Sequence, residues 1–399
     1  MKIVHLAILA PYNEGWGYQE NLLPKDQVRL GHEVTLITSV FQNSKGGTQK
    51  EIGEADYCSP DGFRVIRVKK KKILGTKITE IISLFPVYDL LCEIRPDFIM
   101  IHGLGNITQL QVKKYVKKIH PDCIVAADNH LDVDNSQMLA SARLRHRFLR
   151  FIWRRVTRAM NPFYAAVYGV TPMRAYLARD VFGVQEEKLG VLPAGADDEK
   201  IEFEKREEIS EEIRKKHGIE SDDFLIVTGG KIDRKKNIHI LMEAVTRLRS
   251  ETVKLIVFGD PDEEMRNQFE HLAEHPCIRA IGWISSDETY RYFLAADLVV
   301  FPGLHSVMWE QACACGAPCV FHKLDGIDHV DVGGNCVFAP DISPEGLLQV
   351  LERVIKTDLR QQLKAASRSS KTTVFLYSRL AKKAIECAQG RFPEGKEAK

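Results

Sequence analysis

The residues best suited to carry chemistry lie where a glycine-containing loop opens into a helix. Residues 303–318 read GLHSVMWEQACACGAP and follow a short apolar run, Leu298–Phe301, that is typical of a buried strand. A helix N-terminus offers unpaired backbone N–H groups and the positive end of the helix dipole, which together suit a diphosphate. Glu310 lies about one turn into the helix, where its carboxylate can reach the ribose hydroxyls of a nucleotide. In the loop before this helix, His305, Ser306 and Val307 are also expected to contact the nucleotide. Taken alone, the segment also fits an ordinary strand–helix turn with a solvated glutamate.

A second segment places two lysines after another apolar run. Phe224–Thr228 is followed by GGKIDRKKN, in which Lys231 and Lys236 stand five residues apart across a tight turn at Gly230. Both ammonium groups can point at one pyrophosphate, and fixed cations can stabilise a leaving diphosphate without a metal ion. We therefore expect no metal site and no cofactor. The triplet Asp132–Asp134 has the Asp-x-Asp spacing but falls in the other half of the chain, and a solvated basic run is the alternative for the lysines.

Apolar runs and amphipathic stretches alternate along the chain, and the pattern starts afresh halfway. Such alternation predicts parallel strands joined by helical crossovers. The expected strands are 3–10, 34–38, 98–102, 124–128 and 165–170 in the first half, then 224–228, 254–258, 278–282, 298–301 and 318–322. We predict an α/β protein with two facing, doubly wound Rossmann-like domains and a deep cleft between them. The expected domains span 1–193 and 194–371, followed by a helix and tail over 372–399.

Several moderate motifs occur in a recognisable order. They are the strand start Gly31–Thr38, the linker Gly183–Asp197, the pair Gly230–Lys231 with Lys236, the strand segment Ala296–Pro302 and the helix segment Glu310–Pro318. Over nearly its whole length the chain thus resembles the retaining glycosyltransferases of family 4, which have the GT-B fold. The resemblance implies a nucleotide-sugar donor held by the second domain and an acceptor held by the first. It also implies retention of anomeric configuration and a C-terminal helix that returns to the first domain.

The resemblance assigns roles at the donor site residue by residue. Lys231 and Lys236 would hold the donor phosphates, and Glu310 would hold the ribose. The base would lie near 282–284, which includes Ile284. The loop that would close on the phosphates from the first domain contains Gly15 and Gly17.

Two histidines are candidates for a role at the donor sugar. His130 follows an expected strand of the first domain, where the family has a histidine near the sugar, so the resemblance gives it the catalytic position. His102, at the end of another expected strand, is a second candidate for the same cleft. A histidine at a strand end is also a common structural residue.

The sequence departs from the family pattern at several positions. Pro302 stands eight residues before Glu310, where the family has the first glutamate of a Glu-x7-Glu pair that contacts the donor sugar. Lys231 replaces the usual arginine, which keeps the charge but loses the bidentate geometry. Ala194 replaces the asparagine of the linker. The identity of the sugar therefore stays open.

Positive charge gathers in the first half of the chain. Residues 1–193 carry 27 lysines and arginines against 19 acidic residues, whereas the rest carries 29 against 35, so +8 and −6 give the formal net charge of +2. The excess lies in 67–77, which includes Lys69–Lys72, and in 143–158. In the latter, Arg143, Arg147, Arg150, Arg154 and Arg158 share one helical face, and Leu144, Phe148, Phe151 and Ile152 share another.

This basic helix has two interpretations. It contacts an anionic membrane or a lipid diphosphate acceptor, or it packs its apolar face on the domain and leaves its arginines solvated. Nucleic acid is not an expected partner, because no stacking or recognition motif accompanies the charge.

Composition is that of a soluble globular protein in a reducing compartment. Hydrophobic residues make up 44% and charged residues 28%, which allows a core in each domain. No apolar run approaches the roughly 20 residues of a membrane span. The nine cysteines are scattered, and only Cys313, Cys315 and Cys319 cluster, without partners that complete a zinc site. We expect a cytoplasmic protein, with peripheral contact at the inner face of the membrane as an option.

The predicted function is sugar transfer from a nucleotide-sugar donor to a glycan or lipid-linked glycan of a cell-surface polysaccharide or glycolipid. UDP-sugars are the first donors expected and GDP-sugars the second. A UDP-sugar epimerase on the same scaffold is one alternative, although Pro302 removes a carboxylate that it would need. A donor-binding partner without activity of its own is the other.

Overall fold

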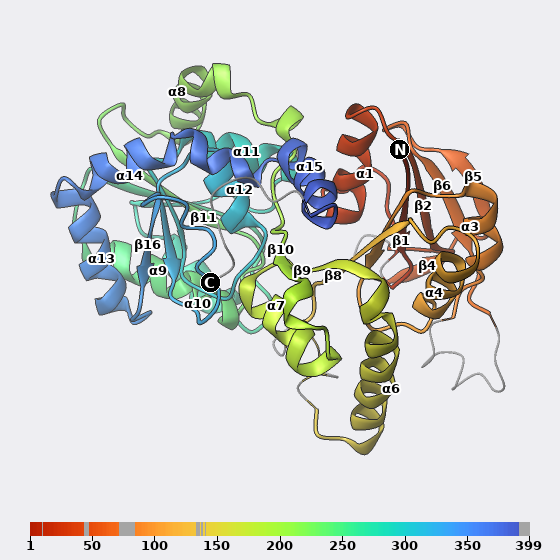
Figure 1. The fold of residues 1–399 in the computed structure, drawn as a ribbon. Coiled ribbons are helices and arrows are strands. Elements are labelled where there is room, and N and C mark those ends of the chain that lie inside the picture. The colour runs from red at the N-terminus through yellow and green to blue at the C-terminus, as the bar shows by residue number, and fades with distance from the viewer. Residues whose placement is uncertain are drawn as a thin grey trace. The chain divides into compact units, whose positions relative to one another are not determined.

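A computed structural model of the chain describes residues 1–9, 11–43, 48–71, 84–132, 136, 139 and 141–390. They form two compact units (Figure 1): unit 1 is Met1–Pro193 with Tyr377–Lys399, and unit 2 is Ala194–Leu376. Both units are α/β, as the alternating pattern predicts. Residues 372–376, expected in the C-terminal segment, belong to unit 2, because they complete a 3-10 helix, Ser370–Phe375, whose last carbonyl accepts from the N–H of Ala196 at 2.9 Å.

Unit 1 is built on an eight-stranded sheet in the order β10-β9-β8-β7-β1-β2-β6-β5. The strands are β1 (Lys2–Ala7), β2 (Glu33–Ser39), β5 (Ala55–Cys58), β6 (Arg64–Val68), β7 (Phe98–His102), β8 (Ile124–Asn129), β9 (Tyr164–Gly169) and β10 (Leu189–Val191), with a separate hairpin of β3 (Phe41–Asn43) and β4 (Gln49–Glu51). All neighbours in the large sheet are parallel except β5 and β6. Because β2 and β7 flank β1, the strand order reverses there. The loops after β1 and β7 thus lie at the switch point where doubly wound sheets bind ligands.

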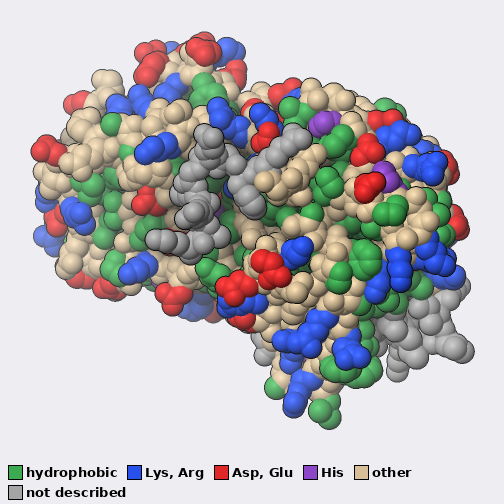
Figure 2. All heavy atoms as spheres, in the orientation of Figure 1, with side chains coloured by type: hydrophobic (Ala, Val, Ile, Leu, Met, Phe, Trp, Pro, Cys, Tyr) green, Lys and Arg blue, Asp and Glu red, His purple; other side chains and the backbone are tan. Residues whose placement is uncertain are grey.

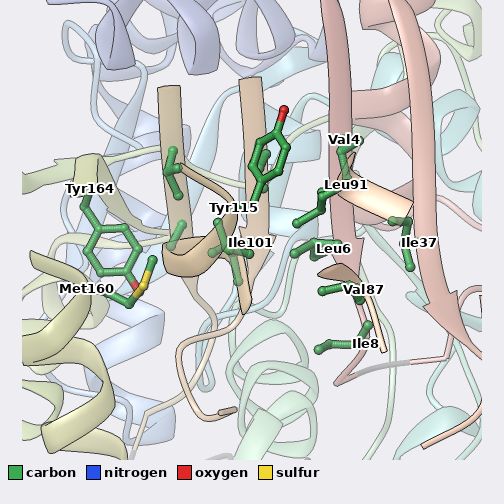
Figure 3. Close-up of a cluster of buried hydrophobic side chains, with 14 of the residues drawn as sticks. Val4, Leu6, Ile8, Ile37, Val87, Leu91, Ile101, Tyr115, Met160 and Tyr164 are labelled. Carbon is green, nitrogen blue, oxygen red and sulfur yellow. The ribbon is translucent and has the colours of Figure 1, made fainter. Parts of the chain in front are cut away.

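Helices cover both faces of the unit 1 sheet, so its central strands are largely apolar, and their few polar side chains, such as His5, His102 and Asp128, are buried. They are α1 (Gln19–Arg29), α3 (Tyr88–Ile94), α4 (Gln109–Lys118), α6 (Leu144–Met160), α7 (Pro172–Leu177) and α15 (Tyr377–Ala388). On one face Val4 and Leu6 pack with Leu91, Tyr115 and Met160 from three helices (Figure 3). On the other face α1 and α15 pack over the alternate residues of the same strands. The C-terminal helix α15 thus completes the core of unit 1, and the carbonyl of its Ala384 accepts from the Tyr168 hydroxyl at 2.9 Å.

Unit 2 is built on an all-parallel, six-stranded sheet in the order β13-β12-β11-β14-β15-β16. The strands are β11 (Phe224–Gly229), β12 (Val253–Phe258), β13 (Ile278–Ala280), β14 (Leu298–Phe301), β15 (Cys319–His322) and β16 (Cys336–Ala339), and the helices are α8 (Arg206–His217), α9 (Ile238–Arg247), α10 (Arg266–Ala273), α11 (Ser286–Ala295), α12 (Met308–Ala314), α13 (Pro344–Lys356) and α14 (Leu359–Ser367). In order of appearance within the unit this is 3-2-1-4-5-6, the order of dinucleotide-binding sheets. The strand order reverses between β11 and β14. The two loops with predicted chemistry follow these two strands.

Glycines let the loops of unit 2 approach at backbone distance. A side-chain carbon added at Gly303, after β14, would lie 2.3 Å from Cα of Lys236 in the loop after β11. One added at Gly259, after β12, would lie 1.9 Å from the carbonyl oxygen of Gly230. The three loops at this edge of the sheet therefore touch through their main chains, which sets their relative positions.

We expect Gly303→Ala to destabilise unit 2, because backbone atoms cannot turn away from the added methyl group as a side chain could. Overpacking of this kind costs about 1–3 kcal/mol, so the midpoint of thermal unfolding should fall by a few degrees or more. Gly17→Ala is the control, because no atom lies within 4 Å of its added carbon. Equal melting temperatures of both variants and the wild type would contradict the close contact of the loops.

Candidate functional site

The loop after β11 is a compact turn that holds both predicted lysines. Gly230 adopts a left-handed φ of 109°, which favours glycine there. The Asp233 carboxylate accepts from the backbone N–H of Lys236 at 3.1 Å and caps the short 3-10 helix Arg234–Lys236. It also lies 3.2 Å from the ammonium group of Lys231, which is largely exposed to solvent. The turn therefore exposes Lys231 to solvent and directs Lys236 toward the loop that follows β14.

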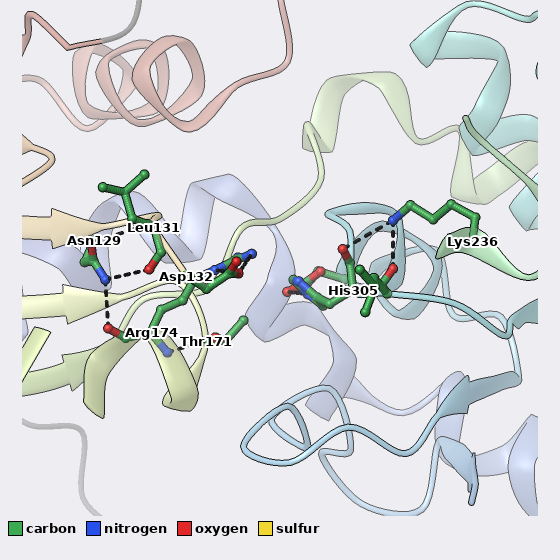
Figure 4. A network of polar contacts seen from close by, with 9 residues as sticks. Asn129, Leu131, Asp132, Thr171, Arg174, Lys236 and His305 are labelled. Carbon is green, nitrogen blue, oxygen red and sulfur yellow. Dashed lines mark hydrogen bonds and ion pairs between the residues drawn. The ribbon is translucent and has the colours of Figure 1, made fainter. Parts of the chain in front are cut away.

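Lys236 joins the two loops of unit 2 (Figure 4). Its ammonium group donates to the carbonyl oxygens of Leu304 at 2.7 Å and His305 at 3.4 Å. A half-buried cation thus lies beside the segment that leads into α12. This helix has only seven residues. Lys236 is therefore a stronger source of positive charge at this loop than the helix dipole on which the sequence argument depends.

Glu310 is a fully buried carboxylate in α12, and the interpretation of a solvated glutamate is wrong. Its Oε1 accepts from Nε2 of His305 at 2.9 Å and from Nε2 of His329 at 2.8 Å. Burial alone would raise the pKa of Glu310, but the two histidines outweigh burial and lower the pKa to about 2. Glu310 is thus an anion at neutral pH.

The second oxygen of Glu310, Oε2, is buried and has no hydrogen-bond partner among the described residues. A buried carboxylate oxygen without a donor is costly unless something supplies one. Hydroxyl groups of a bound ligand would supply it. The site therefore has an acceptor at the place where the sequence predicts a ribose contact.

His329 is a part of this cluster that the sequence did not indicate. It lies in the segment between β15 and β16, 19 positions after Glu310, and no motif links the two residues.

Three further predicted residues of unit 2 are neither fully buried nor fully exposed. Ser306 and Val307 are half-buried in the turn before α12, and Ile284 is half-buried next to the exposed Trp283.

In unit 1 the predicted glycines lie in the loop between β1 and α1. Gly15 is exposed with a left-handed φ of 73°, and Gly17 is half-buried. Between and after them, the rings of Trp16 and Tyr18 meet edge to face, with centroids 5.2 Å apart. The loop follows β1, at the switch point of this sheet.

His130 follows β8 in a loop that is tied down on both sides (Figure 4). The side-chain amide of Asn129 donates to the carbonyls of Leu131 at 3.1 Å and Arg174 at 2.9 Å. Two nitrogens of Arg174 in turn donate to one carboxylate oxygen of Asp132, at 2.8 and 2.6 Å. The loop around His130 is thus anchored to α7.

A buried polar chain ends at His130. The Asp128 carboxylate is fully buried and accepts from Nδ1 of His102 at 2.6 Å and from the N–H of Gly103 at 2.9 Å. Its other contact is with Nε2 of His130 at 3.4 Å. Burial lowers the pKa of His130, but the Asp128 carboxylate outweighs burial and raises it to about 9. His130 is thus protonated at neutral pH.

His102 is an interior residue and not a ligand-facing one. Because ionised Asp128 can only accept, Nδ1 of His102 donates to it, and Nε2 of His102 lies within hydrogen-bond distance of Nδ1 of His5, at 2.9 Å. Nε2 of His5 donates to the side-chain oxygen of Gln27 at 2.7 Å. Burial, together with His102, lowers the pKa of His5 to about 3. The second histidine candidate therefore supports Asp128 from within the core.

Two clusters of described residues bring three possible metal ligands within 4.8 Å of one another: His102, Asp128 and His130 in unit 1, and His305, Glu310 and His329 in unit 2. The sequence did not predict either cluster. In unit 2 both histidines must carry hydrogen on Nε2, because the ionised carboxylate that they contact is only an acceptor. A metal ion there would have to replace both hydrogen bonds.

Comparison with known proteins finds a family match within unit 2. Residues 209–370 match the family profile described as "Glycosyl transferases group 1". The chain is 24% identical over 186 residues to the uncharacterised glycosyltransferase MJ1607 of Methanocaldococcus jannaschii, covering 44% of this chain and 47% of the relative. It is 27% identical over 221 residues to the lipopolysaccharide glucosyltransferase WaaG of Escherichia coli, covering 52% and 58%. The matches thus span about half the length of these curated relatives.

The fold is shared over the full length. The crystal structure of Anabaena HepE in complex with UDP aligns with a TM-score of 0.66 at 15% identity, covering 98% of this chain and 100% of that one. The predicted GT-B fold is confirmed.

We expect Asp128→Asn to lower the pKa of His130 from about 9 to its ordinary value or below, because the substitution removes the charge that opposes burial. Histidine ring signals followed by NMR against pH would measure the shift, with His130→Gln used to assign the signal. Asp122→Asn, an exposed position next to the other end of β8, is the matched control and should leave the pKa unchanged. A pKa that stays near 9 in Asp128→Asn would reject the ion pair as the cause.

Proposed function

We infer from the glycosyl transferases group 1 domain at residues 209–370 that this protein is a glycosyltransferase with a nucleotide-sugar donor. The observation that carries the proposal is the buried, ionised Glu310 of α12, which has an oxygen without a hydrogen-bond partner among the described residues and follows the loop that Lys236 holds at the switch point of unit 2. An anionic acceptor for hydroxyls and a nearby cation are what a nucleoside diphosphate requires.

Each donor residue has a distinct task in this proposal. Glu310 accepts hydrogen bonds from the ribose, and His305 and His329 keep its carboxylate charged and fixed. Lys231 is exposed and lies on the same loop as Lys236, so the two supply positive charge for the diphosphate. That charge stabilises the leaving group as the glycosidic bond breaks, and no bound metal ion takes part. Gly230, Ser306 and Val307 shape the surrounding loops, and Gly15, Gly17 and Ile284 keep the contacts that the family resemblance gives them.

His130 is the residue that we propose to act on the donor sugar. The buried Asp128 carboxylate keeps His130 protonated, so its ring can donate a hydrogen bond to a sugar hydroxyl or carbonyl. Pro302 cannot replace the missing first carboxylate of the family pattern. Its carbonyl accepts from the Asn237 amide at 3.2 Å and so helps to close the donor loops. Retention of configuration and membership of family 4 remain part of the proposal.

The nucleotide and the acceptor are proposed from the named relatives. The complex of HepE with UDP supports UDP as the first nucleotide to test, with GDP as the second. The name of WaaG supports an acceptor that is a glycan or a lipid-linked glycan. Neither an epimerase nor a non-catalytic partner is favoured, because the matched family and both curated relatives are described as glycosyltransferases.

We expect Lys236→Ala and Glu310→Gln to weaken nucleotide binding, because each removes a charged partner. The loss should be on the order of 1.5–3 kcal/mol, or roughly 10- to 150-fold in the dissociation constant. Titration calorimetry with UDP and GDP measures it, and circular dichroism checks that the variants fold. Lys235→Ala is the matched control, since this exposed lysine is the neighbour of Lys236 in the same turn. Unchanged affinity in both site variants would mean that the donor binds elsewhere.

We expect transfer to persist in EDTA, because lysines and not a carboxylate-bound cation face the diphosphate. Released nucleoside diphosphate is measured after incubation with UDP- or GDP-sugars and a panel of glycans and glycolipids. Activity that disappears with EDTA and returns with magnesium or manganese would contradict the metal-free site. The same assay separates the alternatives: an epimerase converts the sugar without releasing nucleotide, and a non-catalytic partner does neither.

A further inference from the structure

Helix α6 has two apolar sides, and only one of them is buried. Trp153, Val156 and Met160 pack into unit 1. Leu144, Phe148 and Phe151 recur at spacings of four and three and fall on the opposite side of the helix. Their exposed fractions are 81%, 63% and 58%. The interpretation that the helix packs this apolar face on its own domain is therefore wrong for its N-terminal half.

The exposed apolar ridge, defined as Leu144, Phe148 and Phe151, lies among arginines. Residues 144–160 contain six arginines and no aspartate or glutamate, and Arg143 precedes them. Figure 2 shows basic and hydrophobic side chains together on the end of unit 1 that α6 forms in Figure 1. Arg155 lies over the ring of Phe151 at 5.9 Å. Hydrophobic and cationic groups thus share one exposed surface.

The arginines of α6 divide into two groups. Arg154 donates to the carbonyl of Asp180 at 2.7 Å, and Arg150 donates to the carbonyls of Leu139 and Ser141 at 3.4 and 3.0 Å. These two stabilise unit 1. Arg145 and Arg147 are exposed, and no ion pair with a carboxylate of the described residues is found for either. They remain available to an external anion.

Two residues of the other predicted basic stretch make contacts within unit 1. Arg67 is buried, and its guanidinium donates to the carbonyls of Ser39 at 3.2 Å and Tyr12 at 3.1 Å, so the charge of this residue does not reach the surface. Lys69 pairs with Glu51 at 3.3 Å. Lys72 lies outside the described residues.

We propose that the exposed side of α6 docks on an anionic lipid bilayer, with the apolar ridge at the boundary of the acyl chains and the arginines at the headgroups. Large apolar groups with basic flanks are the pattern of helices that lie in a membrane interface. A second copy of the chain does not fit, because it would bring the same arginines to the contact. Among the described residues every helix is too short or too polar to cross a bilayer.

This inference deepens the proposed function, since a lipid-linked acceptor would be met at the surface on which unit 1 docks. It can also fail separately, because vesicle binding requires neither donor nor transfer. The full chain is sedimented with phosphatidylcholine vesicles, alone or with about one third phosphatidylglycerol. We expect binding to the anionic vesicles only, weakening as salt rises from about 0.05 to 0.5 M, since salt screens exposed charges.

Two variants locate the surface. Phe148→Ser with Phe151→Ser removes the ridge, and Arg145→Gln with Arg147→Gln removes two exposed charges, each worth about fivefold in partitioning. Both should lower binding at least tenfold while nucleotide affinity and melting temperature stay unchanged. Arg266→Gln with Arg353→Gln, two exposed positions in unit 2, is the matched control and should bind like the wild type.

Three outcomes would overturn the inference. No sedimentation with either vesicle would exclude a lipid surface and point to an acidic protein instead. Equal binding to neutral and anionic vesicles would exclude the role of the arginines. Binding that survives in both α6 variants would place the contact elsewhere on the molecule. Nucleotide binding that fails in the wild type would instead contradict the proposed function and leave the vesicle result valid.

Discussion

The contact of Lys236 with the carbonyls of Leu304 and His305 is the interaction on which the candidate donor site of unit 2 depends. It joins the loops after two strands at the switch point of the sheet, and Gly303 brings their main chains together at the same place. His305 is thereby held where its ring reaches Glu310. The carboxylate can be buried because its donors are already in position. A charge in the interior without such partners would be far too costly.

A similar arrangement, a buried carboxylate with its hydrogen-bond donors already in place, occurs in unit 1. Asp128 is buried at the end of β8 with a histidine and a backbone N–H as donors, and its remaining contact is His130. In both units a histidine fixes a buried carboxylate. In unit 2 the carboxylate has one oxygen without a hydrogen-bond partner among the described residues, whereas in unit 1 the carboxylate sets the charge of a second histidine. Positioning residues such as His102 and His329 are thus as important to these sites as the residues that we expect to contact the donor.

Helix α6 shows that an amphipathic pattern does not by itself tell which apolar face of a helix packs on its own domain. Its apolar residues are numerous enough for two faces, and one face is sufficient to attach the helix to unit 1. The second face stays largely exposed among the described residues, although Arg155 lies over the ring of Phe151. Its arginines are likewise of two kinds, because some bind main-chain carbonyls and others remain solvated. The surface therefore has a structural part and a part available for binding.

The sequence alone determined the α/β class, ten of the strands to within three residues, and the two glycine-containing loops that follow β11 and β14. These depend on local apolar runs and on short-range spacing, which the chain displays directly. It did not indicate β3, β4, β5, β6, β10 or β16, which are short or carry polar residues such as Arg67. Only the tertiary structure decided that Glu310 is buried, that His329 shares its oxygen, and that His102 belongs to the core. It also decided which side of α6 is exposed. Each of these depends on contacts between residues far apart in the chain, or on which of two similar faces meets a neighbour, and no local pattern records that choice.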